Sequence, residues 1–159
     1  MAEKKQETAK GSGKTETELL AAIRVRGTVN INRDIKETLD MLNLRSVNNC
    51  VLVPKTESFS GMLKKTESFL TWGEIDQKML EELVWKRGRL QGEKRLEKDA
   101  AKNVAAKIIK GGTLKGTEIK HMFRLTPPSR GHRTVKRLYP KGACGYRGKD
   151  INQLIKRMV

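Results

Sequence analysis

The stretch 121–149 is the part of the chain whose residue types point most directly to a chemistry. It reads HMFRLTPPSRGHRTVKRLYPKGACGYRGK and holds eight Lys or Arg side chains, four glycines and no acidic residue. Arginine presents a fork of donors that matches phosphate, and glycine lets backbone approach a partner closely. Because these cations repel one another with no acid to offset them, we predict that they face a polyanion. The cations are Arg124, Arg130, Arg133, Lys136, Arg137, Lys141, Arg147 and Lys149.

Two other groups of residues could support enzyme chemistry, and both signals are weak. The sequence Gly13-Lys14-Thr15 matches the end of a phosphate-binding loop, but Thr8 replaces its first glycine and no apolar strand precedes it. His121 and His132 have no Cys, His or acidic neighbour at a spacing that builds a metal or catalytic site. We therefore predict no catalytic residue, no metal and no cofactor, and treat both histidines as loop residues near phosphate.

Composition narrows the class of partner. The formal net charge is +16 and the isoelectric point is about 10.1, which favours nucleic acid or an anionic membrane surface as partner. No stretch approaches the roughly 18 consecutive apolar residues that cross a bilayer, and the first residues lack the apolar centre of a secretory signal. Cys50 and Cys144 lie far apart without a C-x-x-C pairing, as in a reducing compartment. We expect a cytosolic protein; composition alone leaves RNA, DNA and membrane open.

The charge is unevenly distributed along the chain. Residues 1–18 sum to zero, residues 19–75 carry eight basic and six acidic side chains, and residues 76–159 carry twenty-two basic and eight acidic ones. The last segment therefore has a net charge of +14, from 22 minus 8. We predict a flexible N-terminal tail at 1–18, a compact core at 19–75 and a basic extension at 76–159.

The core segment alternates strand and helix patterns. In LLAAIRVRG, Ala21, Ile23 and Val25 alternate with Arg24 and Arg26, which predicts a strand buried on one face only. A helix, a strand, a second helix and a third strand follow, at about 32–42, 48–54, 59–66 and 69–75. This order predicts an α+β fold with both helices on one face of a small sheet.

The extension contains amphipathic helix patterns that begin at Asp76, Asp99 and Asp150. We expect Asn32 and Asp150 to cap the helices that follow them, because short polar side chains satisfy the first backbone N–H groups. Since the last helix follows directly after the basic stretch, both ends of that stretch are expected to be tethered.

Several motifs in order resemble one protein family. LDMLNLRSVNNCVLV, GMLKK and TWGEI occur in the core segment, and FRLTPPSRG and GYRGKDINQLIKRM follow in the extension. Over about residues 20–159 the chain resembles the L-thirty family of large-subunit ribosomal proteins, in the archaeal form that is related to eukaryotic L-seven. The resemblance implies a ferredoxin-like β-α-β-α-β core with a mostly helical basic extension, and a protein without catalytic activity.

The resemblance also implies partners and contact residues. The partners are large-subunit rRNA, with 5S rRNA as a further candidate, and neighbouring ribosomal proteins, in a cytoplasmic, ribosome-bound protein that is not a homo-oligomer. The rRNA-binding residues implied in the core are Arg24, Arg26, Arg33, Arg45, Asn48, Asn49, Ser58, Gly61 and Lys64. Those implied in the extension are Arg124, Arg130, Arg133, Lys136 and Arg147.

Three hypotheses about function follow. The first is a structural rRNA-binding constituent of the large ribosomal subunit. The second is a free RNA- or DNA-binding architectural protein, although the strands AAIRVRG and NNCVLV lack the aromatic residues of single-strand RNA readers. The third is a nucleotide hydrolase that uses Lys14 and Thr15, for which deletion of residues 1–18 is the test.

Overall fold

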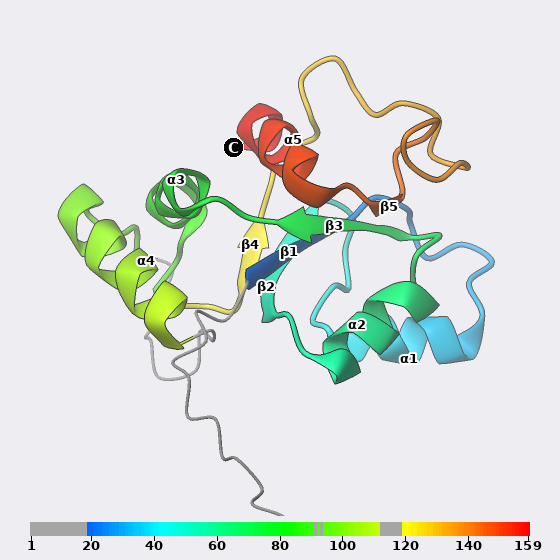
Figure 1. The fold of residues 1–159 in the computed structure, drawn as a ribbon, viewed down its shortest axis with the longest axis horizontal. Coiled ribbons are helices and arrows are strands. Elements are labelled where there is room, and N and C mark those ends of the chain that lie inside the picture. Colours follow the sequence, from blue (N-terminus) through cyan, green and yellow to red (C-terminus); the bar gives the residue numbers. More distant parts are fainter. Residues whose placement is uncertain (1–18, 91, 93, 112–118) are drawn as a thin grey trace, which may run out of the picture.

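The computed structural model describes residues 19–90, 92, 94–111 and 119–159 (Figure 1). The segment 1–18, expected to be a flexible tail, lies outside these residues. In chain order the elements are β1 (Leu19–Arg24), α1 (Arg33–Met41), β2 (Asn49–Pro54), α2 (Glu57–Lys65), β3 (Leu70–Glu74), α3 (Gln77–Arg87), α4 (Lys98–Gly111), β4 (Met122–Arg124), β5 (Gly145–Tyr146), the 3-10 turn η1 (Gly148–Asp150) and α5 (Ile151–Met158).

The strands form one mixed sheet in the order β4-β2-β1-β3-β5. β1 lies in the centre and is antiparallel to both β2 and β3, so the unit β2-α2-β3 is a split β-α-β crossover around it. This arrangement confirms the predicted α+β fold with a ferredoxin-like core. The sequence pattern predicted three strands, whereas the sheet has five. β4 and β5 come from the basic stretch and contain only three and two residues, too few to show a periodicity.

Helices cover both faces of the sheet, with α1 and α2 on one side and α3 and α5 on the other, while α4 packs against α3 (Figure 1). Leu20 and Ala22 of β1 pack in the cluster under α1 and α2, whereas Ala21 and Ile23 belong to the cluster that includes residues of α3, α4 and α5. The prediction that β1 is buried on one face only is therefore wrong. The helices of the extension bury the face of the sheet that α1 and α2 leave open. The alternation of residue types in β1 cannot show that both faces are buried.

Helix starts differ from the expected caps. Asn32 and Asp150 occupy the N-cap positions of α1 and α5, but neither side chain makes a capping hydrogen bond. Instead, the Asp150 carboxylate accepts a hydrogen bond from the Tyr139 hydroxyl. The side chain that does cap a helix is Thr56, whose oxygen accepts from the Phe59 N–H of α2. None of the helices in the described part of the chain is long and apolar enough to cross a membrane.

The C-terminal helix α5 is fixed against the edge of the core at a close backbone approach. A Cβ atom on Gly73 of β3 would lie 2.0 Å from the carbonyl oxygen of Gly148, so only glycine fits there. Asn152 is buried, and its Nδ2 donates to the carbonyls of Glu74 at 3.1 Å and Lys149 at 2.9 Å. Its Oδ1 accepts from the Asp76 N–H at 3.0 Å. One amide therefore joins β3, the start of α3 and the start of α5.

Candidate nucleic-acid interface

One end of the sheet gathers strand termini from the core and from the extension. β1 and β4 end there, and β2, β3 and β5 begin there, because β2 is antiparallel to both β1 and β4 while β5 is parallel to β3. The Asn48 N–H donates to the Arg24 carbonyl at 2.8 Å, and the Leu125 N–H donates to the Asn48 carbonyl at 3.0 Å. The predicted residues Arg24, Asn48 and Arg124 therefore meet at this end.

Two residues of the predicted set are buried there. Arg24 is only 2% exposed. Its Nη1 donates to the carbonyls of Leu44 and Arg45, both at 2.7 Å, and its Nε donates to the Arg26 carbonyl at 2.8 Å. Burial lowers the pKa of this guanidinium from its usual value, and Asp40 opposes the change. The sequence pattern placed Arg24 on a solvent-facing side; the structure corrects this, because α1 and the loop after it cover that side.

Asn48 and Asn49 also belong to this buried junction. Asn48 has a backbone φ of 63° and is half-buried, a conformation that asparagine tolerates better than most residues. Asn49 is 6% exposed, and its Nδ2 lies 2.9 Å from the Met122 sulfur in β4. Both asparagines thus hold the start of β2 in place.

Val25 and Arg26, which follow β1, lie where the core meets the basic stretch. The Arg26 guanidinium lies 4.8 Å from the centre of the Phe69 ring, and the side chain is half-buried. The neighbouring Val25 packs with Ala143 and Cys144 of the basic stretch in a small apolar cluster. Burial raises the pKa of the Cys144 thiol, with the positive charge of Arg26 acting in the opposite direction.

The other predicted core residues lie on the outer surface of α1, of the loop after it and of α2. Arg33 pairs with Glu37 at 2.9 Å and Arg45 with Asp40 at 3.6 Å, and both arginine side chains are highly exposed. Ser58, Gly61 and Lys64 are exposed on α2. This second exposed surface belongs to the helical layer on the opposite side of the sheet from α5.

The basic stretch follows a defined path along α5. The Thr126 and Ser129 N–H groups donate to the carbonyls of Met158 and Arg157 at 3.0 and 3.1 Å. Further on, the Tyr139 N–H donates to the Cys144 carbonyl at 2.7 Å, which closes a compact turn. A Cβ on Gly142 would lie 1.9 Å from the Arg137 carbonyl oxygen, so this turn requires glycine.

Arg147 anchors the end of this path to the sheet. Its Nε donates to Thr71 Oγ1 of β3 and its Nη2 to the Ala143 carbonyl, both at 2.8 Å. The guanidinium also lies 4.9 Å from the centre of the Tyr139 ring. Burial lowers the pKa of Arg147, and the nearby charge of Arg157 acts in the same direction.

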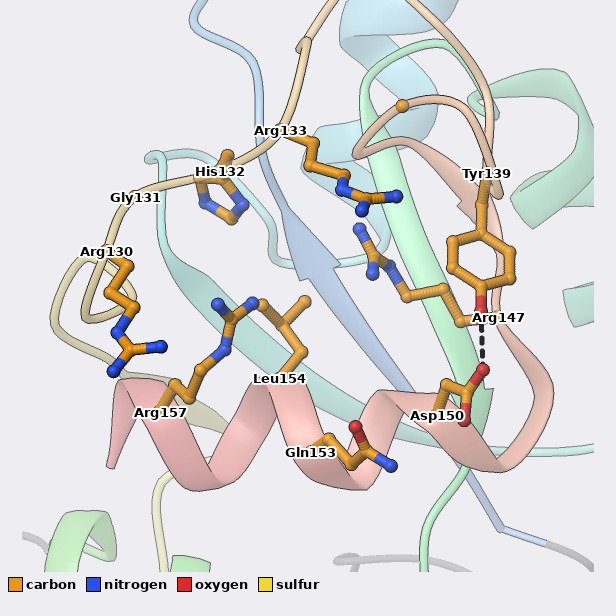
Figure 2. Close-up of a pocket in the computed structure, with 11 residues that line it drawn as sticks. Arg130, Gly131, His132, Arg133, Tyr139, Arg147, Asp150, Gln153, Leu154 and Arg157 are labelled. Atoms are coloured by element: carbon orange, nitrogen blue, oxygen red, sulfur yellow. Dashed lines mark hydrogen bonds between the residues drawn. The ribbon is translucent and has the colours of Figure 1, made fainter.

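Between the basic stretch and α5 lies a hollow of about 470 Å³ (Figure 2). We call it the arginine hollow. Its lining includes three residues of the predicted set, Arg130, Arg133 and Arg147, and one arginine outside that set, Arg157 of α5. The other lining residues are Gly131, His132, Tyr139, Gly142, Asp150, Gln153 and Leu154.

The arginine hollow is strongly cationic. Its lining contains four arginines and one acidic residue, Asp150, whose carboxylate already accepts from Tyr139. That hydrogen bond raises the pKa of the Tyr139 hydroxyl. Burial lowers the pKa of His132, and the charges of Arg147 and Arg157 lower it further. A site of this composition is suited to an anion.

Arg157 could not be found from charge runs. It lies in an amphipathic helix whose apolar stripe, Ile151, Leu154, Ile155 and Met158, predicts only which side is buried. The other predicted cations of the basic stretch do not line the arginine hollow. They are exposed at other positions of the same stretch: Arg124, Lys136, Arg137, Lys141 and Lys149.

Comparison with known proteins gives consistent matches. Residues 20–70 match the family model described as ribosomal protein L30p/L7e. A protein named large ribosomal subunit protein uL30 from Methanococcus maripaludis is 43% identical over 151 residues, covering 87% of this chain and 98% of the relative. Proteins of the same name from Methanosphaera stadtmanae and Nanoarchaeum equitans are 38% and 42% identical, covering 89% of this chain and 100% and 99% of the relatives.

The sequence thus matches, over most of its length, a class of archaeal large-subunit ribosomal proteins. The resemblance seen in the sequence motifs is confirmed. The chain belongs to the ribosomal protein L30p/L7e family, in which its archaeal relatives are named uL30.

Proposed function

We propose that the chain is a structural constituent of the large ribosomal subunit that binds rRNA and has no catalytic role. The chain matches its archaeal relatives over almost their full length, and these relatives are named as a large-subunit protein. The observation that carries the rRNA-binding part is the convergence of strand ends, basic stretch and arginine hollow in one folded region.

Binding would work by phosphate neutralisation on a shaped surface. The exposed cations Arg124, Lys136, Arg137, Lys141 and Lys149 would contact backbone phosphates around the arginine hollow. Together with cations of the core, six or more phosphate contacts would weaken binding roughly a thousandfold or more between about 50 mM and about 200 mM salt. Arg26, Arg33, Arg45, Ser58, Gly61 and Lys64 would add contacts from the core, as the family resemblance implies.

The buried residues would act differently. Arg24 and Asn49 have their side chains inside the protein, and Asn48 is half-buried. We propose that these residues hold the rRNA-facing end of the sheet in its shape without contacting rRNA. Substituting them would then weaken rRNA binding by disturbing the fold.

The test compares two pairs of exposed lysines. We expect the double variant Lys136→Gln and Lys141→Gln to lower the slope of log affinity against log salt by about 1.4 to 1.8 units on an rRNA fragment, because about 0.7 to 0.9 is lost per phosphate contact. The control is Lys102→Gln with Lys107→Gln, which removes the same charge from exposed positions of the helix α4, outside the basic stretch. Equal slopes for both double variants would contradict the proposed surface.

The competing hypothesis of a free RNA- or DNA-binding protein predicts a different distribution. We expect the chain to sediment with the large subunit in sucrose gradients and to run as a monomer when purified. Neighbouring ribosomal proteins, and 5S rRNA as a further candidate, would be found beside it by crosslinking. A pool associated mainly with DNA would support the competing hypothesis.

A further inference from the structure

His132 is the feature of the arginine hollow that protein contacts do not explain. Both ring nitrogens are shielded from solvent, and neither finds a hydrogen-bond partner among the residues that the structure describes. A buried imidazole without partners carries a free-energy cost, because its donor and acceptor have lost their water. The ring lines the same hollow as Arg130 and Arg157 (Figure 2).

The backbone beside His132 is held in an uncommon conformation. Arg130 has a φ of 67° and Gly131 a φ of 69°. The Gly131 N–H donates to the Pro128 carbonyl at 2.9 Å, so Arg130 occupies a turn position that normally favours glycine. An arginine in such a position costs free energy. The turn places the Arg130 side chain at the rim of the hollow (Figure 2).

The arginines at this end of the hollow keep most of their donors available. Arg157 makes one long contact, from its Nη1 to the Ser129 carbonyl at 3.5 Å. Arg147 is different, because two of its donors are used by Thr71 and Ala143. Arg157 and Arg130 can therefore donate hydrogen bonds to a bound ligand, whereas Arg147 holds the lining of the hollow in place.

We propose that the arginine hollow seats one RNA phosphate group, held by Arg130 and Arg157 beside the His132 ring. This inference rests on the proposed function and adds the particular site. Arg147 is a positioning residue that ties the hollow to β3. The volume of about 470 Å³ leaves room for the sugars on either side of the phosphate. The alternative occupant, an acidic side chain of a neighbouring protein, is an outcome of the test.

An anion in the hollow would be linked to protonation of His132. The charged or titratable groups around it are Arg130 and Arg133 from the basic stretch, Tyr139, Arg147, Asp150 and Arg157. In the unbound protein, burial and then the charges of Arg147 and Arg157 lower the pKa of His132 below 6.5. A bound phosphate would offset the positive charges and raise this pKa. Phosphate binding would therefore strengthen as the pH falls from about 6.5 towards the pKa of the unbound protein.

The test uses the two histidines of the chain, because His121 is exposed and serves as an internal control. Imidazole resonances of the full chain are followed by NMR across pH in dimethyl phosphate and in chloride at equal ionic strength. Dimethyl phosphate is a phosphodiester monoanion that does not titrate in this range. We expect it to raise the His132 midpoint relative to chloride and to leave His121 unchanged. Equal movement of both histidines, or of neither, would overturn the inference.

Two neighbouring cations of α5 give a matched pair of variants. We expect Arg157→Gln to abolish the difference between dimethyl phosphate and chloride at His132 and to weaken rRNA-fragment binding by about tenfold. Lys156→Gln removes the same charge from an exposed position outside the hollow and should keep the His132 response. Circular dichroism would verify that both variants are folded.

The inference and the proposed function can fail separately. The chain could bind rRNA and sediment with the large subunit while dimethyl phosphate leaves the His132 midpoint unchanged. The proposed phosphate site would then be wrong and the proposed function would stand. If acetate moves His132 as strongly as dimethyl phosphate, the hollow favours carboxylates and the inference is again overturned. Failure to associate with the large subunit would instead contradict the proposed function.

Discussion

Arginine has opposite roles in two regions of this molecule, the junction around Arg24 and the arginine hollow. At the junction, one guanidinium is buried and donates to three backbone carbonyls of residues 26, 44 and 45. In the hollow, four arginines lie together, and the one acidic residue in the lining is already hydrogen-bonded to Tyr139. The first arrangement satisfies the protein's own acceptors, whereas the second leaves donors for a partner.

The difference shows that charge alone does not mark a binding residue. Arg24 and Arg130 look equivalent in the sequence, but only the environment decides whether the donors serve the fold or a ligand. Substitutions at the junction should therefore change mainly stability, and substitutions in the hollow mainly binding.

The largest loss of stability is expected at the junction. Arg24→Met should lower the free energy of unfolding by about 3 kcal/mol, because three carbonyls lose a charged donor and some of them lie buried. Urea unfolding followed by circular dichroism measures this change. The exposed Arg33→Met should change stability by less than about 0.5 kcal/mol. Similar small effects for both variants would contradict the structural role of Arg24.

The next effect concerns the contact between β3 and the start of α5. Gly73→Ala should lower the free energy of unfolding by about 2 kcal/mol, since its Cβ would collide with the Gly148 carbonyl oxygen. Gly61→Ala is the control, because α2 has open space there. It should raise stability by roughly 0.5 to 1 kcal/mol, as alanine favours a helix interior. A Gly73→Ala variant as stable as the parent would show that α5 is not held this closely.

The arginine hollow should show the reverse pattern. The double variant Arg130→Gln and Arg157→Gln should change the free energy of unfolding by less than about 0.5 kcal/mol, or raise it, because mutual repulsion is relieved. Its affinity for an rRNA fragment should fall by more than about tenfold. Urea unfolding and rRNA binding are measured on the same double variant. A variant that loses stability but binds rRNA with normal affinity would show that these arginines serve the fold and not the ligand.

The smallest effect is the pH dependence of stability in the unbound protein. Because the folded-state pKa of His132 is lowered below 6.5, the unfolded chain takes up its proton first as the pH falls. Stability should therefore decrease as the pH falls below 6.5 and level off below the folded pKa. His132→Asn should remove this component of the pH profile, and His121→Asn should leave it in place.

Much of the fold could be predicted from residue patterns. The helices at Leu39, Leu63 and Leu80 follow from apolar residues at helical spacing, and each of these leucines is buried. The order of the first five elements was also predictable. The strands β4 and β5 were not, because strands of three and two residues carry no periodic signal and depend on pairing with β2 and β3.

The site was predictable in composition but not in geometry. A stretch rich in arginine indicated Arg130, Arg133 and Arg147, which the structure brings together. Arg157 was missed as a member of the hollow because α5 reaches the hollow through tertiary packing. His132 was expected only as a loop residue near phosphate, without its position beside these arginines. Arg24 was assigned to a surface because alternation in β1 cannot reveal that helices cover both faces of the sheet, with α1 and the loop after it on the Arg24 side.

We propose that the basic stretch and the arginine hollow face rRNA in the large subunit. A density map of the large subunit that contains this chain would show whether they do. We expect rRNA phosphates against the exposed cations of 121–149 and one phosphate beside Arg130, Arg157 and His132. Side chains of this surface pointing into open solvent, or covered by protein alone, would contradict it.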